Sequence, residues 1–369
     1  MKIERLELRL LKLPLVHFFE TSFGRIDDKH FILVRLDGAG ASGFGECVAE
    51  QDPYYSSETN DTVWHIIESF VAPRVLDVEF AHPRDVFPAL KAIRGHNMAK
   101  AAVEMAAWDL YARQADVPLA RVLGGTRDRI ASGVSIGIQD TLAGLASKVE
   151  REIAAGYRRI KIKIKPGWDL EAVATVRARF GAVPLMVDAN AAYTRDDADH
   201  LAKLDRYDLM MIEQPLDYDD VMDHAVLQTR IKTPICLDES ILTVADARHA
   251  LELGSCKIVN IKLRRVGGHT EARAIQEYCR NREVPVWCGG MLESGVGRAH
   301  NIAMSTLAGF TLPGDVSASA RYWEEDIIEP PVTVSPQGTI QAPAGPGIGY
   351  EVNERRIESL MRRREEMAL

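Results

Sequence analysis

The 369-residue sequence lacks every marker of a disulfide framework or a thiolate metal site. Its cysteines are odd in number, scattered and without a Cys-x-x-Cys pair: Cys47, Cys236, Cys256, Cys279 and Cys288. Cysteines used in this way are typical of reduced packing residues in intracellular proteins. We therefore expect a cytoplasmic protein whose thiols are not bridged.

Other absences exclude whole classes of partner. No apolar run approaches the length of a membrane span, and the alternating start, Met1–Leu8, predicts a strand instead of a signal peptide. The net charge of −8 and the pI near 5.8 argue against nucleic acid or an anionic membrane as partner. No His-Glu-x-x-His, Walker or Gly-x-Ser-x-Gly motif is present.

The first third of the chain predicts a small α+β unit. A chain of this length, 46% hydrophobic, can build a large core and two domains. We expect three strands, a helix opening at Tyr54–Glu58 and a helix at about Met98–Ala115, with a boundary where Pro118 and Gly124-Gly125 interrupt the helical pattern. The expected strands are Ile3–Leu13, His30–Leu36 and Ser42–Val48.

From about Ser132 the pattern predicts a parallel barrel. Short apolar runs alternate with amphipathic helical segments at a spacing of roughly 25 residues, the size of one strand–helix unit. The runs are Gly133–Ile138, Ile160–Lys165, Leu185–Val187, Leu209–Ile212, Ile235–Leu237, Lys257–Ile261, Pro285–Trp287 and Phe310–Leu312. Eight such units without a Gly-x-Gly-x-x-Gly turn favour a closed barrel over a doubly wound sheet. We expect the Pro- and Gly-rich tail after Asp315 to return to the N-terminal unit.

Charged residues stand at the ends of five consecutive runs. The run Ile160–Lys165 alternates, so its three lysines share one face; an edge strand with lysines in water would show the same pattern. The next runs end at Asp188, Glu213 and Asp238, and the fifth at Lys262. One such carboxylate alone is usually a salt bridge or helix cap. Three in consecutive units converge on the rim where barrels build active sites.

This set predicts a metal-assisted proton transfer. Three carboxylates cannot share a dry pocket as free anions, and a hard cation such as Mg²⁺ resolves the repulsion. Lys163 and Lys262 flank that position and could act on a proton α to a carboxylate, with Mg²⁺ stabilising the enediolate that forms. The base must be neutral, and the charge of Lys161 would lower its pKa.

Further polar and aromatic groups on the rim are candidates for contact with substrate. Each has an ordinary structural explanation too, because rim loops need polar caps and glycine turns. The phenylalanines of residues 17–25 fit a loop tucked under the sheet as well as one that closes over an apolar ligand. The rim candidates are Ser135, Asn190, Ser240, Arg265 and the loop Gly289–Ser294.

The order Lys-x-Lys, Asp, Glu, Asp, Lys resembles the enolase superfamily, whose sites pair a lysine base with Mg²⁺. Motifs along nearly the whole chain resemble its muconate-lactonizing branch, and within it the o-succinylbenzoate synthase / N-succinylamino acid racemase subfamily. These motifs are Glu20–Gly24, Met98–Lys100, Ile160–Asp169, Ile212–Pro215, Pro234–Ser240, Val266–Gly268, Pro285–Gly290 and Leu312–Asp315. One departure is Leu263-Arg264, where many members have Pro-Gly.

The resemblance implies an α/β fold: a modified TIM barrel, (β/α)₇β, with an N-terminal α+β capping domain completed by the C-terminal tail. The implied division is 1–125 capping domain, 126–318 barrel and 319–369 returning segment. It implies Mg²⁺, replaceable by Mn²⁺ or Co²⁺, at Asp188, Glu213 and Asp238, and acid/base residues Lys163 and Lys262. Lys161, Asn190 and Glu239 would be auxiliary. Substrate would contact Phe19, Phe23, Tyr55, Ser135, Arg265, Gly290, Met291 and Leu292, and the phenylalanine loop would close over it.

The activity implied is the syn-dehydration of 2-succinyl-6-hydroxy-2,4-cyclohexadiene-1-carboxylate to o-succinylbenzoate, a step of menaquinone biosynthesis. The same site would racemise N-succinyl or other N-acyl amino acids. Racemisation alone is the alternative. The resemblance thus implies a small-molecule carboxylate as substrate, and we also expect a homo-oligomer. A dipeptide epimerase, a muconate-type cycloisomerase and a non-catalytic barrel are remoter alternatives.

Overall fold

The computed structural model describes residues 1–368, and its N-terminal part is built on an antiparallel sheet. The strand order is β15-β1-β2-β3, so the last strand of the chain lies beside the first. Register pairs Arg5 with Ala368 and Leu11 with Met361. The bounds are β1 Arg5–Glu20, β2 Arg25–Gly38, β3 Ala41–Cys47 and β15 Met361–Ala368. The expected return of the tail to this unit is confirmed.

The first two strands are longer than the sequence analysis expected. Residues 17–25 were expected to be a loop, yet Phe19 pairs with Ile26 and Glu20 with Arg25, so only the tip of a long hairpin is a turn. The pairing is interrupted between Pro14 and Phe19, where proline has no N–H to donate. The hairpin therefore carries its phenylalanines beyond the part of the sheet that β3 and β15 flank.

Helices pack against one face of this sheet. The long helix α4 (Asn97–Gln114) agrees with the expected one and is buried over most of its circumference. It packs closely on β3 because Gly43 and Gly45 have no side chain; a Cβ there would overlap the α4 backbone. The helix expected at Tyr54–Glu58 begins later, at Asn60, because Thr59 supplies the N-terminal cap. The other helices are α1 Asn60–Ile66, η1 Ile67–Val71, α2 Ala72–Val75, η2 Pro83–Asp85, α3 Val86–Ala89 and α5 Leu119–Val122.

The second unit is a curled parallel sheet of seven strands in the order β5 to β11. Its strands are β5 Gly133–Ile136, β6 Arg159–Lys163, β7 Leu185–Asp188, β8 Ile212–Glu213, β9 Ile235–Leu237, β10 Ile258–Ile261 and β11 Val286–Cys288. The eighth strand expected at Phe310–Leu312 is reduced to single bridges, Val286 to Phe310 and Ser132 to Gly314. These bridges place the segment between the two edge strands, which closes the (β/α)₇β barrel.

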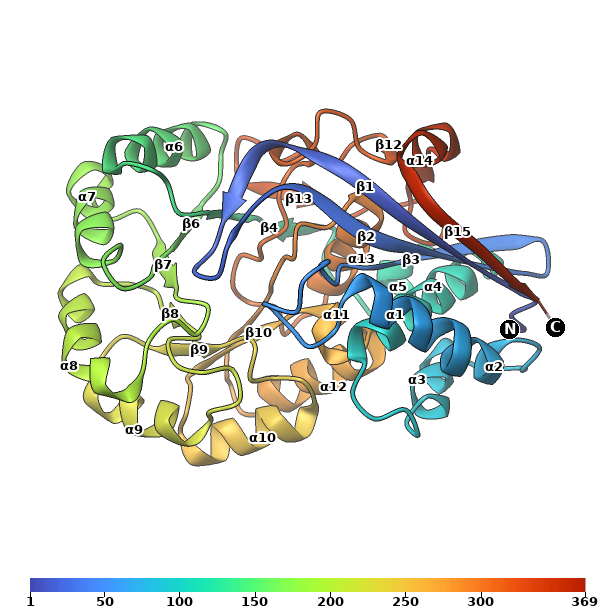
Figure 1. Cartoon of the computed structure of the whole chain (residues 1–369), viewed down its shortest axis with the longest axis horizontal. Helices are drawn as coiled ribbons and strands as arrows, with labels where there is room; N and C mark the ends of the chain where they lie inside the picture. Colours follow the sequence, from blue (N-terminus) through green and yellow to red (C-terminus); the bar gives the residue numbers. More distant parts are fainter. Residues whose placement is uncertain (369) are drawn as a thin grey trace.

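Helices join the barrel strands and surround them (Figure 1). They are α6 Leu142–Ala154, α7 Leu170–Phe180, η3 Arg195–Asp197, α8 Ala198–Leu201, η4 Ala202–Tyr207, α9 Met222–Arg230, α10 Val244–Leu253, α11 Leu263–Val266, α12 His269–Arg280 and α13 Gly295–Ser305. None of the helices among residues 1–368 is long and apolar enough to span a bilayer.

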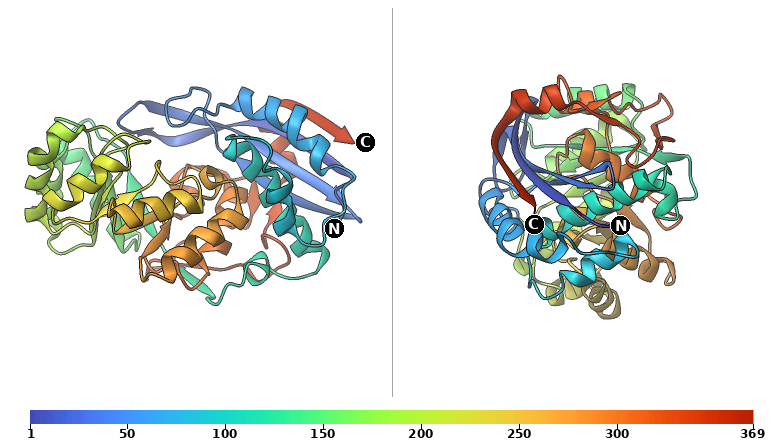
Figure 2. Two further views of the ribbon diagram at one scale, coloured as in Figure 1. Left: turned by 90° about the horizontal axis from the view of Figure 1, so that it is seen from below. Right: turned by 90° about the vertical axis from the view of Figure 1, so that its right-hand side faces the viewer.

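The tail runs back across both units. It contributes η5 Ser319–Arg321, β12 Ile328–Glu329, β13 Thr339–Gln341, β14 Glu351–Val352 and α14 Glu354–Leu360. Strand β13 pairs with β4 (Arg129–Ala131), and β12 pairs with β14, before β15 joins the N-terminal sheet. Figure 2 shows this sheet along one side of the barrel, with both chain ends at the same extremity.

Candidate active site

The charged residues expected at the strand ends do come together. Parallel register sets Lys163 beside Asp188, and Asp188 beside Glu213. Asp238 directly follows β9, and Lys262 directly follows β10. All five side chains are buried, and the three carboxylates have no solvent exposure. The barrel therefore gathers them at the carboxyl end of its sheet.

Lys161 lies among three carboxylates. Its Nζ is 2.6 Å from Asp315 Oδ2, 2.9 Å from Glu213 Oε2 and 3.1 Å from Asp188 Oδ2. Burial alone would lower the pKa of Lys161, but Asp315, Glu213 and Asp188 raise it above its ordinary value. Lys161 is thus a fixed positive charge that balances part of the buried negative charge.

Lys163, on the same face of β6, has the opposite shift. Its Nζ is 2.6 Å from both Asp188 Oδ2 and Asn190 Oδ1. Burial lowers the pKa of Lys163 and Asp188 opposes this, while the nearby charge of Lys161 lowers it further. Asn190 in turn donates from Nδ2 to Glu239 Oε1 at 3.0 Å. One strand therefore carries a permanently charged lysine next to one that is easier to deprotonate.

Lys262 contacts a different carboxylate from Lys163. Its Nζ donates to Asp238 Oδ2 at 2.7 Å and to the Tyr55 hydroxyl at 2.9 Å, and it lies 4.7 Å from the Tyr55 ring centroid. Tyr55 belongs to the loop after β3, so the N-terminal unit contributes directly to this lysine.

Arg265 is placed differently from the expectation that it contacts substrate. Its guanidinium is buried, and it donates to the backbone oxygens of Ile241 and Asn260 at 3.0 and 2.7 Å. It also forms an ion pair with Asp238 Oδ1. Because these contacts turn it towards the carboxylate, Arg265 does not line the cavity.

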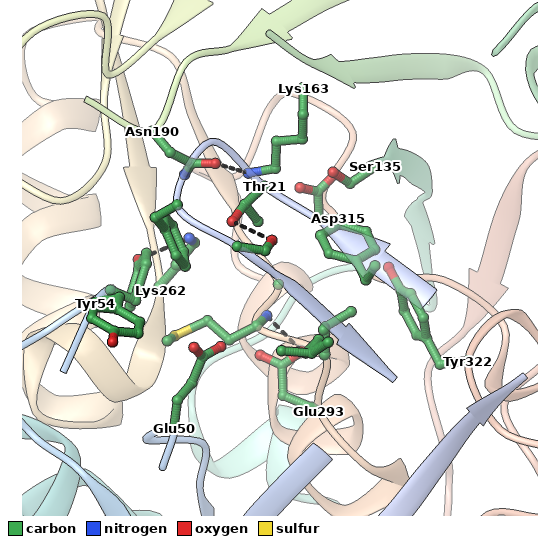
Figure 3. Close-up of a pocket in the computed structure, with 18 of the residues that line it drawn as sticks. Thr21, Glu50, Tyr54, Ser135, Lys163, Asn190, Lys262, Glu293, Asp315 and Tyr322 are labelled. Carbon is green, nitrogen blue, oxygen red and sulfur yellow. Dashed lines mark hydrogen bonds between the residues drawn. The ribbon is translucent and has the colours of Figure 1, made fainter. Parts of the chain in front are cut away.

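One cavity opens onto both lysines (Figure 3). It lies between the barrel rim, the β1–β2 hairpin tip and the loop after β3. Of the eight residues expected to contact substrate, the seven other than Arg265 line it: Phe19, Phe23, Tyr55, Ser135, Gly290, Met291 and Leu292. The Ser135 hydroxyl is buried without a hydrogen-bond partner, so a polar group entering the cavity could satisfy it.

The hairpin tip is fastened to the rim by several contacts. Glu20 O accepts from Ile138 N at 2.9 Å, and the Ser22 hydroxyl donates to Asn190 O at 3.1 Å. Lys165 Nζ lies 3.3 Å from Glu20 Oε1. The third lysine of the alternating strand therefore holds the hairpin, while the other two face the carboxylates.

Two buried residues of this site were missed by sequence reasoning. Asn260 donates from Nδ2 to Glu213 Oε1 at 2.7 Å and to Asp238 Oδ1 at 3.1 Å. Asp315 pairs with Lys161, and with Arg159 at 2.6 Å. Asn260 precedes Lys262 by two, so strand alternation already put both on one face. Asp315 ends the motif Leu312–Asp315, whose position gave no hint of its partners.

Comparisons with known proteins identify the family of this chain. The family described as "Enolase C-terminal domain-like" matches residues 144–356, and "Mandelate racemase / muconate lactonizing enzyme, N-terminal domain" matches residues 7–124. An o-succinylbenzoate synthase from Geobacillus kaustophilus is 56% identical over 96% of this chain and 95% of that protein. An N-succinylamino acid racemase from Amycolatopsis is 48% identical over 95% of both.

A solved structure gives the same result. An enolase-superfamily member from Listeria innocua superposes with a TM-score of 0.96 at 41% identity, covering 100% of this chain and 99% of its own. The family matches span both units of the fold, and the relatives match nearly end to end. The chain belongs to the enolase superfamily, in its mandelate racemase / muconate lactonizing enzyme family.

Proposed function

We propose that this protein is a Mg²⁺-dependent o-succinylbenzoate synthase that also racemises N-succinyl or N-acyl amino acids. The observation that carries the proposal is that two buried lysines, Lys163 and Lys262, line one cavity and contact different members of the buried carboxylate set, Asp188 and Asp238. Relatives of both names, at 47–56% identity, support it.

The buried residues fit a hard divalent cation. Enolase-superfamily sites combine a lysine or histidine base with Mg²⁺. Asp188, Glu213 and Asp238 offer oxygen ligands from adjacent strand ends, and Mn²⁺ or Co²⁺ could replace Mg²⁺ there. Within residues 1–368 no group of three or more Asp, Glu, His or Cys side chains is arranged to hold a metal. The carboxylates are contacted by basic side chains, namely Lys161, Lys163, Lys262 and Arg265. When bound, the cation would supply positive charge that stabilises an enediolate.

In the dehydration, Lys163 would carry out both proton transfers. Its lowered pKa favours the neutral amine that can remove the proton α to the substrate carboxylate. The C–O bond to the β-hydroxyl then breaks, and Lys163 returns the proton to the leaving oxygen, so that water departs from the same face. Lys262 would remain charged and stabilise the enediolate from the other side.

In the racemisation both lysines would carry protons. One removes the α-proton and the other delivers a proton to the opposite face of the planar intermediate. Lys262 is equipped for this because it has its own partners, Asp238 and Tyr55, independent of those of Lys163. Racemisation without dehydration is therefore the second candidate function, and a side-by-side assay with both substrates in deuterated water separates the two.

The decisive variant is Lys163→Ala, with Lys257→Ala on an exposed lysine as the matched control. We expect Lys163→Ala to lose dehydration by at least about 10³-fold, since it removes both the base and the acid, while Lys257→Ala keeps the wild-type rate. Dehydration by folded Lys163→Ala at the wild-type rate would contradict the assigned role.

A further inference from the structure

Arg264 departs from the Pro-Gly pattern and is buried at the junction of the two units. It lies two residues after Lys262, in α11, and has no solvent exposure. A fully buried guanidinium is expensive unless its donors are satisfied. Four acceptors satisfy this one: Glu293 Oε1 at 3.0 Å, Asn301 Oδ1 at 2.7 Å, Gly297 O at 2.7 Å and Glu46 O at 3.4 Å.

Its partner Glu293 connects Arg264 to the cavity wall. One oxygen of Glu293 accepts from Arg264 and from Asn301 Nδ2, and the other accepts from Met291 N at 3.0 Å. Met291 lines the cavity, and Glu293 lies at its edge, on the side away from Lys163 (Figure 3). The guanidinium is thus two hydrogen bonds from the backbone of the segment Gly290–Leu292.

That segment needs an external support. Leu292 has a φ of 57°, a left-handed conformation that costs energy for a side chain of this kind. The backbone N–H of Met291 is held in place by Glu293 alone among the side chains. Such a conformation persists only where the surroundings enforce it.

A second buried carboxylate makes Arg264 hard to replace. Glu46, from β3, accepts from Ser294 N and Gly297 N at 2.9 Å each, and from the Ser294 hydroxyl. A Cβ on Gly297 would lie 2.5 Å from Arg264 Nη2 and 2.9 Å from both Glu293 Cβ and Glu46 Oε2, so the three groups converge on one point. Without the guanidinium, the buried carboxylates of Glu293 and Glu46 would lose the positive charge that lies beside them.

We propose that Arg264 is a positioning residue that holds the Gly290–Leu292 wall of the cavity through Glu293, and thereby sets how tightly the cavity grips the substrate portion remote from the transferred proton. The choice of substrates for the kinetic test rests on the proposed function. The structural role of Arg264 in holding the Gly290–Leu292 segment does not depend on it. Because the interaction is equal in ground and transition states, its loss raises KM more than it lowers kcat.

The test uses Arg264→Met, Arg264→Lys and Glu293→Gln, with Arg280→Met on an exposed arginine as control. We expect Arg264→Met to raise KM for both substrates about tenfold, with kcat within about threefold of the wild-type value. Arg264→Lys should restore part of the affinity, because lysine keeps the positive charge but lacks the planar guanidinium with its several donors. Arg280→Met should match the wild type. Wild-type KM in folded Arg264→Met overturns the proposal.

Hydrogen exchange followed by mass spectrometry gives a readout independent of turnover. Exchange in peptides covering residues 289–294 should rise about tenfold in Arg264→Met and in Glu293→Gln, while exchange in β5 stays unchanged. If Arg264→Met does not fold, the exchange of Glu293→Gln tests the proposal, since this variant leaves the other three acceptors of Arg264 in place. Wild-type exchange of residues 289–294 in Glu293→Gln overturns the proposal. If the wild-type protein converts neither substrate, the proposed function fails and the exchange result still decides the role of Arg264.

Discussion

The Tyr55 hydroxyl accepts a 2.9 Å hydrogen bond from Lys262 Nζ, which links a loop of the capping sheet to a lysine of the barrel. Only racemisation asks Lys262 to transfer a proton. Tyr55→Phe keeps the ring against the ammonium and removes the acceptor, so we expect racemisation to fall about tenfold and dehydration to change by less than about threefold. The measurement is kcat for both reactions with one enzyme preparation.

The control for this variant is Tyr218→Phe, a tyrosine that is 61% exposed and does not line the cavity. It should leave both rates unchanged. An equal loss of both reactions in Tyr55→Phe would show that the hydroxyl serves substrate binding in general and not Lys262.

Asn260 orients two of the carboxylates proposed as metal ligands, Glu213 and Asp238. Residues that orient metal ligands typically contribute about 10- to 100-fold to metal affinity. We therefore expect Asn260→Leu to weaken Mg²⁺ binding by a factor in that range, measured by titration calorimetry on folded protein. The exposed Asn281→Ala is the matched control, and unchanged affinity in Asn260→Leu would refute the orienting role.

Lys148 on α6 is 7% exposed, and its pKa is lowered to about 8 by burial, helped by the charges of Arg321 and Arg151 and opposed by Glu152. Between pH 8 and 10.5 Lys148 binds its proton more strongly in the unfolded chain than in the folded protein. The free energy of unfolding therefore rises with pH across that window. Below pH 8 the cost of the buried charge is present in full, on the order of 1–3 kcal/mol.

Lys148→Met should therefore raise Tm at pH 7, and the gain should shrink by pH 9.5. Thermal unfolding at both pH values measures this, with the exposed Lys203→Met as control. A gain of the same size at both pH values would mean that the variant acts through packing and not through the charge.

Sequence reasoning located the strand-end residues well because period-two alternation and the barrel repeat fix both their face and their rim. The expected fold class and family are confirmed. It failed where tertiary contacts decide. The length of the β1–β2 hairpin depends on pairing across Phe19 and Ile26, and the partners of Asp315 come from strands far away in sequence. The contact of Arg265 with substrate stays a prediction. Its side chain turns towards Asp238 and two backbone oxygens, a direction that its position on the rim alone does not reveal.

Other expectations stay predictions. They are the division of the chain at residues 125 and 318, the cytoplasmic location, the homo-oligomer, and the roles assigned to the metal ligands and acid/base lysines.

Strand β15 pairs along β1 from Arg5 to Leu11, and β1 leads directly into the hairpin that covers the cavity. During synthesis the ribosome completes every barrel strand, with both lysines and all three carboxylates, before residues 361–368 emerge. The sheet can therefore gain its outer strand β15 only after all of these groups have been made. The strand that completes the support of the hairpin over the cavity is thus made later than the groups that the hairpin covers.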